Sequence, residues 1–131
     1  MDIQGGRMQT ISYTRLYVDA DGESHFERVE AELAPEGEEP EFQALAIGPA
    51  SHCRVVGASP AWQGAEPHIS PRRQVFCTLR GEYEVTASDG TSQRFPPGRL
   101  LLLEDTTGKG HTTQLTGGGD LLVLVVTLKE E

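Results

Sequence analysis

Three side chains in the second half of the chain have the types and spacing of a binding or catalytic site: His68, Gln74 and His111. Side chains alternate between the two faces of a strand, so His68 and Gln74, an even number of residues apart, share one face if the chain stays extended. Strand pairing and barrel closure then bring His111 opposite them. Imidazoles bind zinc, iron, manganese, nickel or copper, and a glutamine oxygen is a weaker, neutral ligand. The sequence therefore predicts a histidine-lined pocket, and these three residues are the candidate ligands for a divalent metal ion if one is bound.

Two charged residues near this group are further catalytic candidates. Glu104 follows four leucines, and a carboxylate at the end of an apolar strand can be partly desolvated, which suits general acid or base chemistry. Glu104 and the adjacent Asp105 can equally cap the Thr-Thr-Gly turn that follows. Arg72 shares the parity of Gln74 and suits an anionic or carbonyl group of a substrate, or else a salt bridge with an acidic residue at the rim. Both roles stay open for each residue.

The other histidines have weaker claims on the site. His25 lies in an expected strand and either faces the cavity or is structural or exposed, with the second reading favoured. His52 adjoins Cys53, and strand neighbours point to opposite faces, so a shared metal ion is not expected. The sequence does not decide whether His25 and Asp105 line the pocket. The aromatic residues most simply read as core or pocket walls are Trp62, Phe76 and Tyr83.

Short strands separated by glycine and proline turns are expected to position these residues. The windows with strand character are residues 11–18, 24–33, 42–47, 53–56, 72–79, 82–87, 99–103 and 121–128. Asp89-Gly90 is a strong hairpin signal between two of the expected strands. Residues 34–40 are acidic and contain proline and glycine, which indicates a loop. No segment keeps a helical period for about ten residues, so the sequence predicts an all-β barrel or sandwich.

The residues around the candidate site resemble the first motif of the cupin superfamily, which runs Gly, His-x-His, Glu and a later Gly. The matching residues are Gly64, His68, Ser70, Gln74 and Gly81. Ser70 stands at the place of the second histidine and Gln74 at the place of the glutamate. Loss of the glutamate removes a negative charge that would help to hold a divalent ion.

A second cupin motif begins with Pro-Gly and ends in a histidine on the following strand; here Pro97, Gly98 and His111 are similar to it, at a slightly longer spacing. The resemblance implies one cupin-type double-stranded β-helix, or jelly-roll barrel, over residues 1–131. The motifs lie within residues 64–115, and the N-terminal strands and the acidic loop lie within residues 1–60.

The resemblance also implies an enzyme that converts a small organic molecule in the barrel. A metal ion would polarise a carbonyl or enol oxygen, and Glu104 or a histidine would move a proton, as in isomerases, cyclases and lyases. The alternatives are a metal-dependent dioxygenase, a metal-free pocket whose histidines do the acid–base work, and a non-catalytic module that binds a small ligand. A decayed site in a fold that serves assembly is a further alternative.

Composition limits the partners. The formal net charge is -9, with 20 acidic and 11 basic residues, which argues against nucleic acid and against anionic membranes. The apolar run 121–128 is too short to span a bilayer, and residues 1–10 lack the pattern of a secretory signal. Cys53 and Cys77 are therefore expected to be reduced thiols in a cytoplasmic protein. A homodimer is expected, joined by residues 121–128 or by the N-terminal strands.

Overall fold

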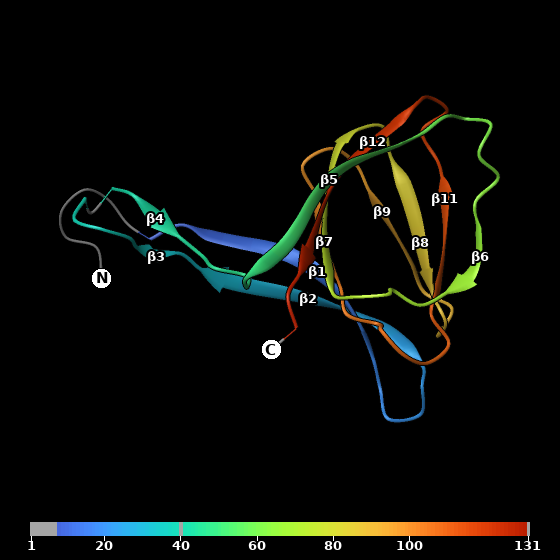
Figure 1. The fold of residues 1–131 in the computed structure, drawn as a ribbon, viewed down its shortest axis with the longest axis horizontal. Helices are drawn as coiled ribbons and strands as arrows, with labels where there is room; N and C mark the ends of the chain where they lie inside the picture. The colour runs from blue at the N-terminus through green and yellow to red at the C-terminus, as the bar shows by residue number, and fades with distance from the viewer. Residues whose placement is uncertain (1–7, 40, 131) are drawn as a thin grey trace.

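The computed structural model describes residues 8–39 and 41–130, and these residues form β-strands without any helix (Figure 1). No helix able to cross a membrane is therefore present in these two ranges. Outside these ranges lie residues 1–7, which include most of the stretch expected to lack a secretory signal, and Pro40 of the acidic loop. The strands are β1 (Thr10–Val18), β2 (Ser24–Glu32), β3 (Ala34–Pro35), β4 (Gln43–Ala44), β5 (Ala50–Ala58), β6 (Ala65–His68), β7 (Gln74–Arg80), β8 (Tyr83–Ala87), β9 (Ser92–Phe95), β10 (Leu100–Leu103), β11 (His111–Leu115) and β12 (Leu121–Leu128).

The strands form two main sheets that pack face to face. The larger sheet has the order β2-β1-β10-β7-β12-β5, the smaller one β6-β11-β8-β9, and β3 pairs with β4. In Figure 1, β1 and β2 reach beyond the packed sheets as an arm, with β3 and β4 toward its far end. The prediction of an all-β fold is confirmed. The closed barrel is not, because no sheet of the described residues closes on itself by strand pairing.

Alternating burial along the strands explains the core. In β8, Tyr83, Val85 and Ala87 are buried and the residues between them are not. In β12, Val123 and Val125 are buried and alternate with partly exposed aliphatic residues. The buried faces of these two strands belong to opposite sheets and share one hydrophobic cluster. One face of each sheet therefore forms the core, and the cavity described below opens on the same face.

A bend corrects the expected placement of the site residues on one extended strand. The chain bends at Pro71 and Arg72, so β7 begins only at Gln74. His68 ends β6 in the smaller sheet, and Gln74 starts β7 in the larger sheet. Both side chains still face the cavity, but from opposite walls. The two side chains therefore reach the same cavity because their sheets face each other. They do not lie on one face of a single strand.

Two glycines fix turns that matter for the site. Gly90 has a φ of 95° in the hairpin between β8 and β9, as the Asp89-Gly90 pair predicts. Gly110 has a φ of 79°, and a Cβ at this position would clash with the carbonyl oxygen of His68. Only glycine fits there. This close approach allows His111, the next residue, to pair directly with His68 across β11 and β6.

Candidate functional site

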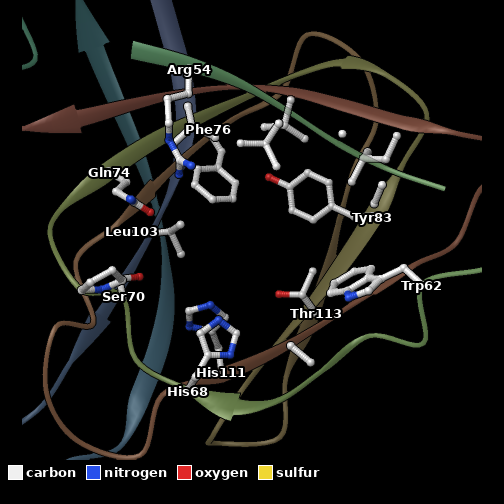
Figure 2. A pocket seen from close by; sticks show the side chains of 18 residues that line it. Arg54, Trp62, His68, Ser70, Gln74, Phe76, Tyr83, Leu103, His111 and Thr113 are labelled. Atoms are coloured by element: carbon white, nitrogen blue, oxygen red, sulfur yellow. The ribbon is translucent and has the colours of Figure 1, made fainter. Parts of the chain in front are cut away.

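A cavity of about 460 Å³ lies between the two sheets, a size that suits a small organic molecule. The larger sheet contributes residues of β5, β7, β10 and β12, and the smaller sheet contributes residues of β6, β8 and β11. Figure 2 shows the imidazoles of His68 and His111 at one end and Arg54 beside Phe76 at the other. Within residues 8–39 and 41–130, no aspartate or glutamate lines the cavity.

His111 is held by a buried carboxylate behind the cavity wall. Its Nδ1 lies 2.5 Å from Oδ2 of Asp105, and the side chains are 5% and 0% exposed. The hydroxyl of Ser70 donates to the other carboxylate oxygen at 3.0 Å, and the Ser70 backbone N–H donates to the Asp105 carbonyl, also at 3.0 Å. A carboxylate oxygen accepts, so Nδ1 of His111 is the donor of this pair and carries the proton. The other ring nitrogen, Nε2, is thereby left for the cavity.

His68 has the same tautomer for a different reason. Its Nδ1 lies 2.9 Å from the backbone carbonyl of Glu66, which can only accept, so this nitrogen is the donor. The ring centroids of His68 and His111 are 4.7 Å apart. His68 is exposed and His111 is buried. The pair therefore offers two Nε2 atoms at one end of the cavity, one near solvent and one held in place.

Two imidazoles are an incomplete donor set for a divalent metal ion. Stable protein sites for zinc and similar ions use three or four donors. No group of three or more histidine, cysteine, aspartate or glutamate side chains converges in the described ranges. In Figure 2, Ser70 and Leu103 lie between Gln74 and the imidazoles. The two imidazoles alone are too few donors for a resident ion, and the metal set of His68, Gln74 and His111 stays a prediction.

The two charged candidates lie outside the cavity lining. Arg72 is exposed in the bend before β7, and Glu104 follows β10. Glu104 forms ion pairs with Arg15 of β1 and with Arg73, whose Nε lies 2.9 Å from Oε2. The rim salt bridge considered for Arg72 is thus made by its neighbour Arg73. Catalytic roles for Arg72 and Glu104 stay predictions, and the structure places neither side chain against the space that a ligand would fill.

Sequence reasoning missed Arg54. Its position opposite Val125, which in turn lies opposite Phe76, puts the three side chains on one face of the larger sheet. Arg54 lines the cavity and forms no ion pair with any described residue. The shared parity of Arg54 and Val56 along β5 is the signal that could have found it. Trp62, Phe76 and Tyr83 line the cavity, as expected of pocket walls.

Tyr83 brings a buried, unpaired hydroxyl to the cavity. The residue is 1% exposed, and its hydroxyl has no hydrogen-bond partner in the described structure. Burial raises the pKa of the phenol, so the group stays protonated. The nearby Thr78 hydroxyl partly opposes this rise in the pKa of Tyr83. The Thr78 hydroxyl donates its hydrogen bond to the Phe95 carbonyl, and it does not form one with Tyr83. Tyr83 is therefore a protonated donor in the cavity wall (Figure 2).

His25 lies away from the cavity lining, in a surface cluster. Its two ring nitrogens lie 2.7 Å from Asp19 and 2.8 Å from Asp89. The hydrogen bonds to Asp19 and then to Asp89 raise the pKa of His25. His52 and Cys53 are exposed on β5 and also lie outside the lining, and both cysteines are free. These groups take no part in the site.

Comparison with known proteins does not assign this chain to a family. No family model and no curated protein matches it. Among solved structures, a conserved protein of unknown function from Streptococcus pyogenes is similar, with 22% identity and a TM-score of 0.42. The match covers 60% of this chain and 65% of that one, less than two thirds of its length. At this level it establishes neither a shared function nor the cupin assignment.

Proposed function

We propose that this protein is an enzyme that moves a proton on a small organic molecule in the cavity, with His111 as the general base. The observation that carries the proposal is the buried Asp105–His111 pair, which uses one ring nitrogen for orientation and leaves the other for a ligand. A general base needs this combination of a fixed tautomer and a free lone pair. Isomerases, cyclases and lyases that act next to a carbonyl group use such a step.

The chemistry follows from the donors and acceptors around the cavity. Nε2 of His111 removes a proton from a carbon next to a carbonyl group; the electrons of that C–H bond form a C=C bond, and the π electrons of the carbonyl move to its oxygen. A donor near the developing charge stabilises it, and the protonated phenol of Tyr83 is such a donor. The proton then returns from Nε2 of His111 to another atom of the same molecule, which restores the neutral imidazole. Asp105 acts through His111 and is a positioning residue.

We also propose that the two facing sheets form a cupin-type jelly roll. The cupin-like order of Gly64, His68, Gly81 and His111, and a cavity between two facing sheets, support a jelly-roll relationship. In this chain Ser70 supports the carboxylate behind His111. The position where the family pattern has a ligand histidine thus serves acid–base chemistry here.

Deuterium exchange tests the proposal even though the natural substrate is unidentified. A panel of aryl ketones with enolisable protons, such as 4-oxo-4-phenylbutanoate, is incubated with the protein in D2O, and loss of the C–H signal is followed by proton NMR. The wild-type protein is expected to accelerate exchange for at least one compound. His111→Ala should lower that rate by about 10² to 10⁴. His68→Ala should lower it less, because its neighbour keeps the base.

His52→Ala is the matched control, since His52 is exposed on β5 and outside the cavity lining. Exchange at the buffer rate throughout the panel, or equal rates in the wild-type and His111→Ala proteins, would overturn the proposal. The same samples are measured after treatment with a chelator and by elemental analysis. Activity that disappears on chelation and returns with one metal would replace the metal-free mechanism with the metal-dependent one.

A further inference from the structure

We infer that the cavity binds a flat carboxylate, with the carboxylate group on Arg54 and the apolar body extending toward His68 and His111. The inference deepens the proposed function by naming its substrate class and rests on it for the role of His111. The binding itself is tested separately. Three observations carry it: the charge of the lining, the unpaired phenol of Tyr83, and the row of side chains that leads from Arg54 into the cavity.

The charge of the lining selects an anion. The chain has 20 acidic residues and a formal net charge of -9, yet none of the described residues that line the cavity is acidic. It contains one arginine, Arg54, which has no carboxylate partner among the described residues. A planar guanidinium matches a carboxylate with two parallel hydrogen bonds. A cationic ligand would find no counter-charge in this space.

The Tyr83 hydroxyl indicates that a ligand brings an acceptor. A buried hydroxyl without a partner is costly, and native structures seldom keep one without a reason. Tyr83 lines the cavity and its hydroxyl lies in the wall, while the hydroxyl of Thr113 faces the hollow in Figure 2. An oxygen in the body of the ligand would satisfy the phenol. The ligand class is therefore a carboxylate that carries a second oxygen, such as a keto or enol group.

The cavity walls favour an apolar, flat body between these polar ends. One row of side chains crosses β5, β12 and β7 and consists of Arg54, Val125 and Phe76. The guanidinium of Arg54 therefore adjoins the apolar wall that the other two residues form. Figure 2 shows Arg54 beside Phe76, Tyr83 on the opposite wall and Trp62 at the side. Aromatic side chains suit an aromatic or conjugated ring system. Such a ligand would place its far end beside Nε2 of His111.

Calorimetric titration with naphthalene-2-carboxylate and its neutral amide, naphthalene-2-carboxamide, tests the role of Arg54. The wild-type protein is expected to bind the acid more tightly than the amide. Arg54→Gln should weaken binding of the acid by about tenfold or more, since a charge-assisted pair is lost, and leave the amide nearly unaffected. Arg80→Gln is the matched control, because Arg80 is exposed at the end of β7 and outside the lining.

The outcomes separate this inference from the proposed function. No binding of the acid, equal affinity for acid and amide, or equal losses in Arg54→Gln and Arg80→Gln would overturn it. A loss in Arg72→Gln in place of Arg54→Gln would also overturn it, because the anion would then sit at the bend. His111→Ala should still bind the acid. Binding through Arg54 without deuterium exchange in any compound would leave the inference standing and remove the proposed function.

A second probe tests the acceptor that Tyr83 requires. Chromone-2-carboxylate has a similar flat shape to the naphthalene acid and adds a ring carbonyl. The wild-type protein is expected to prefer it by about fivefold, and Tyr83→Phe should abolish that preference while keeping the volume of the side chain. No preference in the wild-type protein, or a preference that survives in Tyr83→Phe, would overturn the role of the phenol.

Discussion

Two histidines of this protein contact aspartates: His111 at the cavity and His25 at the surface. Their contrast shows what distinguishes a candidate catalytic histidine from a structural one. His111 meets one aspartate in the interior, where the two side chains are 5% and 0% exposed. His25 meets two aspartates at the surface, where its own side chain is 30% exposed. His111 keeps one nitrogen for the cavity, whereas both nitrogens of His25 are used. A histidine can do acid–base chemistry only if one nitrogen is left for the ligand.

The His25 cluster joins the two sheets at their turns. Asp19 lies in the turn between β1 and β2, and Asp89 lies in the turn between β8 and β9. Carboxylates only accept, so His25 must donate from both nitrogens and is charged in this arrangement. The cluster therefore stabilises through charge, which solvent and salt screen, whereas the Asp105–His111 pair depends on burial.

Among changes to the partners of the two histidines, Asp105→Asn should have the largest effect. An amide can turn its NH₂ group toward Nδ1 and stabilise the wrong tautomer, so deuterium exchange should fall about 10- to 100-fold. Loss of the buried charge-assisted hydrogen bond should lower the free energy of unfolding by about 2 kcal/mol, measured by urea denaturation. Asp89→Asn is the control at the exposed histidine. If it lowers exchange as much as Asp105→Asn does, the buried and the exposed aspartate do not differ in their role.

A smaller effect is expected from Ser70→Ala. Ser70 is 3% exposed and supplies one hydrogen bond to Asp105, while Asp105 keeps His111. The unfolding free energy should fall by about 1 kcal/mol. Exchange should fall only a few-fold, with Ser70→Thr restoring part of it through its hydroxyl. A fully active Ser70→Ala protein of unchanged stability would show that Asp105 needs no second partner.

The smallest effect concerns the pH dependence of stability in His25→Gln. The pKa of His25 lies above its ordinary value of 6.5, so this stabilisation is fully present below about pH 6.5 and is lost as the pH rises through the raised pKa. Hydrogen bonds from His25 lower the pKa of Asp19, and those from Thr91, and then His25, lower the pKa of Asp89, both from an ordinary value of 3.8. Their share is present above about pH 3.8 and is lost as the pH falls through the lowered values.

Melting temperatures of the wild-type and His25→Gln proteins at about pH 5.5 and about pH 9 measure this dependence. The difference should be larger at the lower pH, and added salt should reduce it because the cluster is exposed. An equal difference at both pH values would mean that His25 acts through packing, for example on Tyr17, whose ring centroid lies 5.6 Å away. Deuterium exchange should not change in either case.

The strands were predictable where packing on one face leaves an alternating pattern. Residues 82–87 and 121–128 predict β8 and β12 closely, because their inward side chains must be apolar. Residues 42–47 predict a strand, but only Gln43–Ala44 pairs, and β5 extends well beyond residues 53–56. Pairing partners set these lengths, and the sequence of one segment does not contain them.

The site was predictable in its histidines and not in its supports. His68 and His111 are found together, as the motif order predicts. The sequence left Asp105 open between turn cap and buried carboxylate, since its burial depends on Ser70 and His111 from other parts of the chain. Arg54 gains its place only because β5 pairs with β12 beside the cavity. Contacts between distant segments decide both residues.

The ion pairs of Glu104 have a consequence for the timescale on which the site moves. Glu104 joins β1 and the start of β7 at the end of β10, its backbone N–H donates to Leu16 at 2.8 Å, and Asp105 is the next residue. Exposed loops fluctuate within nanoseconds to microseconds, but this corner can open only when several strands separate. The orientation of His111 should therefore stay unchanged during the fast motions of the exposed loops.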